Sequence, residues 1–224
     1  IVIDDFSSDN TLKLLKDFKE NNKGIDFKYY HLKSNKGPNI AKNFGSKNAL
    51  GNYLIFLDSD DCFYDNNSLF NINEELGKNN YPNLGMFTSF YISEKIAKKP
   101  KFSNLQFKEF LRNKNIGEFL PVVKKQIFLD FPFFKTIIGG EGLTWLKITK
   151  ESGYIFYSEI VVRLYDDFSE NRLSTFSSSF KKRLYNIQIL FIKEFWVDFL
   201  KYYPYGLFKN LIKIIYYGFP SYKK

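Results

Sequence analysis

The chain has 224 residues, of which 44% are hydrophobic and 25% charged, a composition typical of a globular protein. Its 33 Lys and Arg outnumber its 24 Asp and Glu, giving a net charge of +9 and predicting an anionic partner. Its single cysteine excludes a disulfide framework, and its apolar runs fall short of the ~20 residues that a membrane-spanning helix needs.

The chain opens inside a predicted strand. Ile1 to Ile3 are apolar, and Asp4 and Asp5 follow at the carboxyl end of this strand. Because no initiator Met or earlier element precedes it, we expect the chain to be a fragment that lacks its amino-terminal strand and helix. Polar N-cap candidates at residues 7–9 then introduce a helical apolar pattern that ends before Gly24.

The next elements continue the alternation of strand and helix. Residues 27–32 predict a strand, and Pro38 is placed to open a helix that ends before Gly51. The run Tyr53 to Leu57 predicts a strand buried on both faces. A β-α-β-α-β order within about sixty residues favours a parallel, doubly wound sheet.

Three carboxylates follow that third strand directly, in the run Asp58-Ser59-Asp60-Asp61. Ligands of open α/β sheets bind beyond the carboxyl ends of the strands. Carboxylates so close together repel one another, so we expect a cation between them, and aspartate oxygens suit Mg²⁺ or Mn²⁺. The alternative is a solvated acidic turn without a ligand.

The middle of the chain is less regular. Residues 68–77 predict a helix and residues 84–92 a strand. Residues 93–116 are polar and poorly periodic, so we expect either a mobile segment near the substrate or a surface insertion. A helix is predicted over residues 143–151, followed by two strands at 154–158 and 161–165.

The tail from Thr175 onward differs in character. Large apolar and aromatic residues recur at helical spacing on both sides of Pro204, and lysines punctuate them. We therefore divide the chain into a domain at 1–174 and amphipathic helices at 175–224. Basic amphipathic helices can lie on an anionic membrane surface, and the alternative is that they pack on the sheet. No nucleic-acid module is recognised, so we expect no nucleic acid partner.

Five motifs, taken together in their order and spacing, resemble the family 2 glycosyltransferases of the GT-A fold. The resemblance is dense over residues 1–65, thinner over 118–166 and absent from the tail. It implies an α/β, Rossmann-like nucleotide-sugar domain with a mostly parallel central sheet. The motifs are Ile1-Val-Ile-Asp-Asp-x-Ser-x-Asp-x-Thr11, Asn35-x-Gly37, Ala41-Lys-Asn-x-Gly45, Gly51-x-Tyr53 and Leu57-Asp-Ser-Asp-Asp61.

The first motifs are implied to hold the nucleotide. By the resemblance, Asp4 and Asp5 accept hydrogen bonds from the uracil and ribose of a nucleotide sugar, and Ser7 belongs to the same cofactor-binding motif. Lys42 stands where the family often has Arg, near the base and the phosphates. A lysine keeps the positive charge there but lacks the planar fork of the guanidinium.

The acidic run is implied to hold a divalent metal. Asp58 and Asp60 match the family's Asp-x-Asp, Ser59 lies between them in the nucleotide-sugar site, and Asp61 is a further candidate ligand. Bound Mn²⁺ or Mg²⁺ neutralises the charge that grows on a departing nucleoside diphosphate.

The catalytic base of the family lies in a Glu-Asp pair at a helix start. The matching position reads Gly140-Glu141-Gly142, so the glutamate is kept and the aspartate is replaced. Glu141 is our candidate base. The alternatives are that the base is Asp130, Asp166 or Asp167, and that Glu141 only satisfies backbone N–H groups at a helix start.

The predicted function is inverting transfer of a sugar from a nucleotide-diphosphate donor, with a UDP-sugar favoured, to a growing glycan or lipid-linked glycan. The resemblance places this activity in bacterial capsule, lipopolysaccharide or other surface polysaccharide synthesis, at the cytoplasmic face of the plasma membrane. A non-catalytic, GT-A-like scaffold on the membrane surface is the alternative. A receiver domain of two-component signalling does not fit the residues after Asp58.

Overall fold

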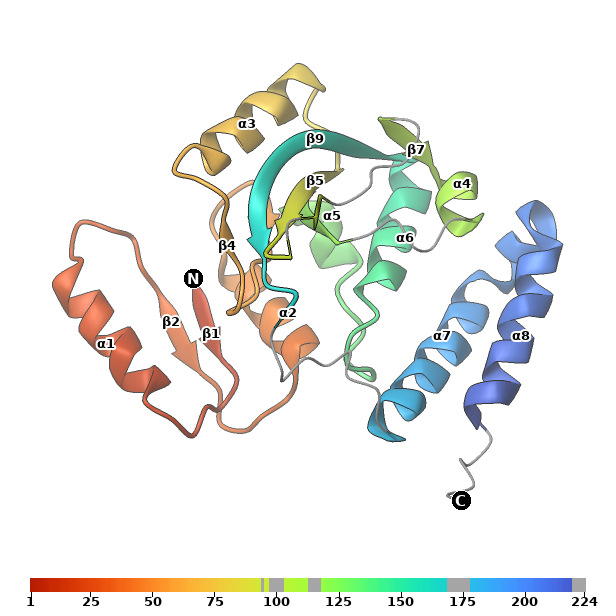
Figure 1. The fold of residues 1–224 in the computed structure, drawn as a ribbon, viewed down its shortest axis with the longest axis horizontal. Helices are drawn as coiled ribbons and strands as arrows, with labels where there is room; N and C mark the ends of the chain where they lie inside the picture. The colour runs from red at the N-terminus through yellow and green to blue at the C-terminus, as the bar shows by residue number, and fades with distance from the viewer. Residues whose placement is uncertain (94, 97–102, 113–117, 169–177, 219–224) are drawn as a thin grey trace.

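A seven-stranded mixed sheet forms the centre of the protein in the computed structural model, which describes residues 1–93, 95–96, 103–112, 118–168 and 178–218. Figure 1 shows this sheet between two outer parts, with β1, β2 and α1 at one end and α7 and α8 at the other. Five of its strands run in the order β3 (Tyr53–Ile55), β8 (Phe119–Lys124), β5 (Leu84–Tyr91), β9 (Tyr154–Tyr165) and β4 (Cys62–Phe63). Two short strands complete it, β6 (Lys95–Ile96) beside β5 and β7 (Asn104–Gln106) beside β9.

The α/β class is confirmed, whereas the mostly parallel arrangement is wrong. Only β5 and β9 pair in parallel within the described part of this sheet. β8 runs antiparallel to both β3 and β5, and β4 runs antiparallel to β9. The sequence analysis did not predict β8, which contains Pro121, a residue that normally argues against a central strand.

The first two strands form a separate sheet. β1 (Val2–Asp4) and β2 (Tyr29–His31) pair in parallel, and α1 (Thr11–Asn21) connects them as predicted. The third predicted strand, β3, joins the large sheet instead, so the expected single doubly wound sheet does not form among the described residues. β3 also ends two residues earlier than predicted, at Ile55.

Three longer helices agree with the sequence prediction. They are α2 (Pro38–Asn48), α3 (Ser68–Lys78) and α6 (Glu141–Ser152). Pro38 occupies the first turn of α2, where its missing N–H costs nothing. The two strands expected after α6 are one continuous strand, β9, with irregular register beside Phe87, Thr88 and Ser89 of β5.

The stretch 93–116 contributes to the core where it is described. β7 pairs with β9, and α4 (Phe107–Arg112) buries three apolar side chains, so these residues are not a surface insertion. Residues 94, 97–102 and 113–117 of this stretch lie outside the described residues. A second short helix, α5 (Lys125–Asp130), follows β8 directly.

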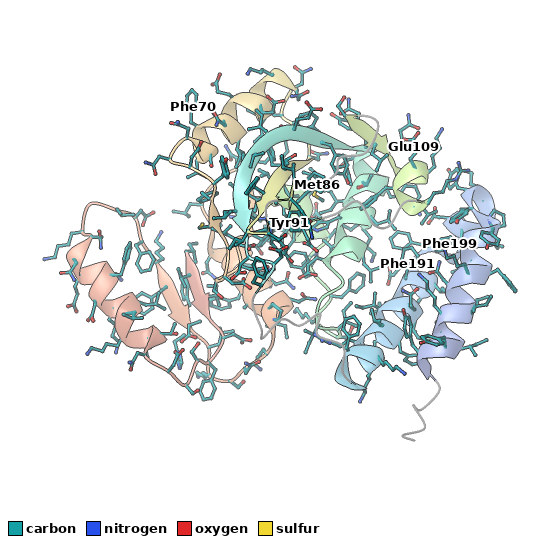
Figure 2. All side chains as sticks on the ribbon, viewed as in Figure 1. Phe70, Met86, Tyr91, Glu109, Phe191 and Phe199 are labelled. Carbon is teal, nitrogen blue, oxygen red and sulfur yellow. The ribbon has the colours of Figure 1, made fainter. Side chains whose placement is uncertain are left out.

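The C-terminal helices are α7 (Ser178–Tyr202) and α8 (Pro204–Gly218). Phe191, Phe195 and Phe199 of α7 are at most 3% exposed and belong to the same core cluster as Trp145 of α6. Figure 2 shows Phe191 and Phe199 on the α7 and α8 side of the molecule. α7 therefore packs on the main domain, while the predicted boundary at 174/175 lies outside the described residues.

Two ion pairs also join α7 to α6. Lys147 Nζ lies 2.6 Å from Glu194 Oε2, and Lys150 Nζ lies 2.8 Å from Asp198 Oδ2. α8 packs along α7, and Gly206 lies so close to Tyr203 that a Cβ there would come within 2.1 Å of its ring. A residue without a side chain is needed at that contact.

Candidate active site

The acidic run forms a turn that begins three residues after the end of β3 at Ile55. The Asp61 backbone N–H donates to the Asp58 carbonyl oxygen at 3.1 Å, which closes the turn over four residues. Ser59 and Asp60 are exposed at its tip. The turn thus presents Asp58 and Asp60 outward from the sheet, while the Asp61 side chain is only 1% exposed.

One cavity of about 540 Å³ collects most of the predicted site residues. Phe56, Phe133 and Trp145 line part of it and pack edge to face or tilted against one another, which gives it an aromatic wall. The predicted residues that line it are Lys42, Asp58, Ser59, Asp60 and Glu141. Residues from four separate parts of the chain therefore meet at one place.

Lys42 connects the two acidic groups of this cavity. Its Nζ lies 2.7 Å from Asp58 Oδ1 and 3.7 Å from Glu141 Oε1. Burial of the ammonium opposes its charged form, but the carboxylates of Asp58 and Glu141 outweigh that effect and raise the pKa of Lys42 above its ordinary value. Lys42 is therefore a fixed positive charge between the predicted metal ligand and the predicted base.

Glu141 is the first residue of α6, at the end of a glycine turn. Gly140 has φ +76°, a left-handed conformation that glycine adopts readily, and a Cβ there would come within 2.7 Å of Ile137 Cδ1. A Cβ on Gly142 would meet no atom within 4 Å in the described structure. A Cβ thus meets no contact among the described residues at the position where the resembled family has aspartate.

Two asparagines on α2 hold the loop that leads to Glu141. Asn39 Nδ2 donates to the carbonyl oxygens of Phe134, Ile137 and Gly139 at 3.0–3.1 Å. Asn43 Nδ2 donates to the Phe133 carbonyl oxygen at 2.8 Å and its Oδ1 accepts from the Phe133 N–H at 3.0 Å. The sequence analysis gave neither residue a role, although their spacing of four places them on one helix face.

The first acidic pair does not line the cavity. Asp4 is buried, with its carboxylate accepting from the Ser7 N–H at 3.0 Å and lying 2.6 Å from His31 Nδ1. Burial alone would raise the pKa of Asp4, but the hydrogen bonds to Ser7 and His31 hold it below its usual value. Asp4 thus holds the residues after β1 and the end of β2 together through hydrogen bonds of its carboxylate.

Asp5 also binds backbone of this chain. Its two carboxylate oxygens accept from the N–H groups of Lys36 and Gly37 at 2.8 and 2.6 Å. The next residue is Pro38, which lines the cavity. Asp5 therefore fixes the turn that leads into α2, and the predicted contacts of Asp4, Asp5 and Ser7 with a nucleotide stay predictions.

Asp61 faces a partner that the sequence analysis missed. Its Oδ2 lies 3.1 Å from Arg163 Nη1 on β9, and its Oδ1 accepts from the Asp166 N–H at 3.3 Å. Burial raises the pKa of Asp61, although the Arg163 guanidinium acts against this shift. The prediction that Asp61 reaches a metal stays a prediction, but its carboxylate is engaged by the guanidinium.

The alternative bases lie elsewhere. Asp130 is the last residue of α5, and Asp166 and Asp167 follow β9. None of the three is among the described residues that line the cavity. Asp167 accepts hydrogen bonds from the backbone and the hydroxyl of Ser93. Among the carboxylates weighed as bases, Glu141 is the one that shares the cavity with Asp58 and Asp60.

The donor set fits a divalent ion that a ligand helps to hold. Among the described residues, no three or more side chains of Asp, Glu, His and Cys gather into a metal site. Asp58 and Asp60 nevertheless both line the cavity, and Mg²⁺ is usually bound through one or two carboxylates with water and phosphate completing its shell. The pair thus suits an ion that arrives with a diphosphate.

Comparison with known proteins points to one family. The family model described as "Glycosyl transferase family 2" matches residues 1–133. The GalNAc(5)-diNAcBac-PP-undecaprenol β-1,3-glucosyltransferase of Campylobacter jejuni is 28% identical over 189 residues, which cover 83% of this chain and 60% of that protein. A poly-β-1,6-N-acetyl-D-glucosamine synthase of Staphylococcus epidermidis is 41% identical over 88 residues, covering 39% of this chain and 20% of the synthase.

Solved structures share the fold. A mannosyltransferase from Pyrobaculum calidifontis, solved with GDP-Man and Mn²⁺, has a TM-score of 0.63 at 14% identity. The match covers 97% of this chain and 63% of the mannosyltransferase chain. TarS from S. aureus has a TM-score of 0.61 at 15% identity, over 85% of this chain and 55% of the TarS chain. The match thus spans 60% of the glucosyltransferase, 20% of the synthase, and 63% and 55% of the two solved chains.

Proposed function

Since this chain belongs to glycosyl transferase family 2, we propose that it transfers a sugar from a nucleotide-diphosphate donor to a glycan acceptor, with inversion at the anomeric carbon. The observation that carries the proposal is that Lys42, Asp58, Asp60 and Glu141 meet in one cavity. Lys42 lies on α2 and the two aspartates on the turn after β3, whereas Glu141 comes from α6, far along the chain. Their meeting supplies both a place for a diphosphate and a carboxylate for proton transfer.

The donor's diphosphate binds at the acidic turn. Asp58 and Asp60 would hold Mg²⁺ or Mn²⁺, which as a Lewis acid neutralises the charge on the departing nucleoside diphosphate. Lys42 adds a buried positive charge beside this position. The family resemblance places Asp4, Asp5 and Ser7 next to the base and ribose, and we favour a UDP-sugar as the donor.

Glu141 acts as the general base in this proposal. The acceptor hydroxyl oxygen attacks the anomeric carbon, its proton passes to the Glu141 carboxylate, and the bond from the anomeric carbon to the phosphate oxygen breaks with its electron pair going to the diphosphate. Lys42 lies 3.7 Å from Glu141 and keeps the carboxylate near a positive charge before substrate enters. Attack opposite the leaving group inverts the configuration.

Binding of UDP tests the proposal. Isothermal titration of the protein with UDP should give binding that strengthens when Mn²⁺ is added, because Asp58 and Asp60 would hold the ion and its charge would favour the diphosphate. Asp60→Asn should lose the Mn²⁺-dependent part. The replacement of the family's aspartate by Gly142 favours a second candidate, a non-catalytic scaffold, and binding that is absent with and without Mn²⁺ would support that reading instead.

The acceptor is proposed by analogy with the relatives. One relative is named for an undecaprenol-linked glycan and another for a poly-N-acetylglucosamine product. We therefore place this chain in bacterial surface polysaccharide, lipopolysaccharide or capsule synthesis, with a hexose as the transferred sugar. Mass spectrometry of products from a panel of UDP-sugars tests the choice of donor.

We further propose that α8 rests on the cytoplasmic face of the plasma membrane. Tyr205, Phe208, Ile215 and Tyr216 are each at least 59% exposed on this helix, and Lys209 lies among them. A helix with exposed aromatic residues and basic residues binds anionic lipid surfaces. Within the described part of the chain, no helix is long and apolar enough to cross a bilayer.

Liposome co-sedimentation tests the membrane proposal. Removal of the whole tail would also remove Phe195 and Phe199 from the core, so a surface substitution is the sharper probe. Phe208→Asp with Ile215→Asp should abolish binding to phosphatidylglycerol vesicles. Phe70→Asp is the matched control, because Phe70 is 64% exposed and points outward from α3 (Figure 2). Equal binding by all variants would contradict the proposal.

A further inference from the structure

Arg163 lines the cavity and carries a buried hydrogen-bond donor that the predicted function does not use. Its side chain is 5% exposed, and within the described structure its Nη2 atom has no hydrogen-bond partner. A buried donor left without a partner destabilises the folded protein, so a native protein that keeps one calls for an explanation such as a ligand that completes it.

The rest of the guanidinium is held in place. Its Nε donates to Ser89 Oγ at 2.8 Å, and its Nη1 lies 3.1 Å from Asp61 Oδ2. Its Cζ lies 4.8 Å from the centre of the Tyr165 ring. Two hydrogen bonds and a ring contact fix the planar group, so Nη2 is preorganised to donate in one direction.

The charge of Arg163 is already balanced. Asp61 is its buried partner, and the two side chains are 5% and 1% exposed. Nη2 therefore lacks a hydrogen-bond acceptor rather than a counter-charge. A sugar hydroxyl oxygen, which is neutral and accepts hydrogen bonds, meets that need.

Arg163 belongs to the wall of the cavity that the strands form. Tyr165 lies beside it on β9 and packs on Tyr91 at 5.1 Å, and the Tyr91 hydroxyl accepts from the Glu118 N–H at 3.1 Å. Tyr165 and Glu118 also line the cavity. Lys42 and Glu141, by contrast, come from the helices α2 and α6.

We infer that Arg163 is a specificity-determining residue of the acceptor site, whose Nη2 donates a hydrogen bond to one hydroxyl oxygen of the acceptor glycan. The inference rests on the proposed function, because it names the substrate that this wall of the same cavity binds. Asp61 directly follows Asp60, so the competing ligand for Nη2 is a phosphate oxygen of the donor. The experiment separates these two ligands.

Arg163→Lys is the test variant, since lysine keeps the positive charge near Asp61 and removes Nη2. Two rates are measured with each UDP-sugar of a panel: hydrolysis of the donor by water, and transfer to p-nitrophenyl glycosides. The variant should lower kcat/KM for the best glycoside on the order of 10- to 100-fold. Donor hydrolysis and the Kd for UDP should change by less than about twofold, since neither involves an acceptor hydroxyl.

A monodeoxy series of that glycoside identifies the hydroxyl. The wild-type protein should discriminate against one deoxy compound, and Arg163→Lys should not, because a polar group built for a hydroxyl rejects the analogue that lacks it. Arg112→Lys is the control. Its Nη2 donates to the Tyr202 carbonyl oxygen at 2.8 Å, outside the cavity, so both rates should be unchanged.

The outcomes are distinguishable. An unchanged acceptor kcat/KM in Arg163→Lys, or a parallel loss of UDP binding and hydrolysis, overturns the acceptor role. A wild-type protein that neither binds UDP nor hydrolyses any donor overturns the proposed function first, and this inference with it. If Arg163→Lys does not fold, Ser89→Ala frees Nε and should lower the same acceptor kcat/KM by a smaller factor, and no change there counts against the inference.

Discussion

The amino-terminal region, residues 1–61, and the region from β8 to α8, residues 118–218, contribute to the same cavity in different ways. In the first region, α1 buries none of its residues, and β1 pairs with β2 in a sheet that has two strands among the described residues. In the second, β8, β9, α6 and α7 contribute most of the buried apolar side chains of the main core.

The two regions place their site residues differently, one at an exposed turn and the other on elements of the core. Asp58 and Asp60 stand at an exposed turn, so their charges serve a ligand more than the core. Glu141 and Arg163 stand on elements that also carry the core, so packing fixes where they lie. Substitutions at the exposed turn should therefore change activity alone, whereas substitutions at Glu141 and Arg163 can change both activity and stability.

The largest effect is expected at the exposed turn. Asp60→Asn removes one of the two carboxylates that would hold the metal, and the lost stabilisation of the departing diphosphate should lower kcat by about 10³-fold or more. The free energy of unfolding should stay within about 0.5 kcal/mol, because the side chain is exposed. Nucleotide release and urea unfolding measure the two quantities. Turnover retained in this variant would count against a metal at Asp58 and Asp60.

The next effect sharpens the role of Glu141. Glu141→Gln keeps the shape of the side chain but cannot accept the proton, so kcat should fall by about 10²- to 10⁴-fold while the Kd for UDP stays within about twofold. Single-turnover transfer measures the change. If this variant kept wild-type turnover, Glu141 would not be the base, and Asp130, Asp166 or Asp167 would be the remaining candidates.

A rescue variant serves as the control for that result. Gly142→Asp, added to Glu141→Gln, places a carboxylate where the space is open and should recover part of the lost kcat. An aspartate in the first turn of α6 also suits the helix dipole, so the helix should not be destabilised. A double variant that stays inactive would show that the carboxylate must stand at 141 itself.

The third prediction tests whether α7 belongs to the core. Phe199→Ala removes a side chain that is 0% exposed and should lower the free energy of unfolding by about 3–5 kcal/mol, with one cooperative transition. Phe208→Ala, at a position 61% exposed on α8, should change it by less than about 0.5 kcal/mol. Urea denaturation followed by tryptophan fluorescence compares them. Equal effects would mean that α7 does not share the main core.

The smallest effect concerns Asp4. Its pKa is lowered in the folded state, so its carboxylate stabilises the fold fully above an unfolded pKa of about 3.9, and this contribution is lost as the pH falls through the lowered value. The difference in unfolding free energy between wild type and Asp4→Asn should therefore shrink from pH 6 towards pH 3. If the difference in unfolding free energy grew as the pH fell, the pKa of Asp4 would be raised in the folded state and the prediction would be wrong.

Much of the amino-terminal region could be predicted, because its elements are short and local. Pro38 begins α2 and the apolar run before Asp58 forms β3, since both depend on neighbours within a few residues. The five motifs indicated the family, which the family model over residues 1–133 confirms. Asp58 and Asp60 were chosen from the acidic run at a strand end and from the same resemblance, and Glu141 from the resemblance alone.

The pairing of strands could not be predicted in this way. β8 was missed because Pro121 argues against a strand locally, whereas in the fold β3 and β5 flank it. Arg163 was missed because a charged residue in an apolar strand gives no signal of its partner, and Asp61 lies 102 residues away in the sequence. The roles of Asn39 and Asn43 could not be predicted either, because their hydrogen-bond partners lie in the distant loop at 133–139.

The sequence by itself determined the longer helices, the acidic turn after β3 and the family, since these follow from residues close together in the chain. The tertiary structure decided which charges share a cavity: Lys42 lies between Asp58 and Glu141, Asp4 and Asp5 bind backbone and His31, and Asp61 pairs with Arg163. The physical reason is the distance along the chain between the residues that interact. Secondary structure depends on contacts within a few residues, whereas an ion pair or a hydrogen bond in a cavity depends on strand order and helix packing that no local pattern records.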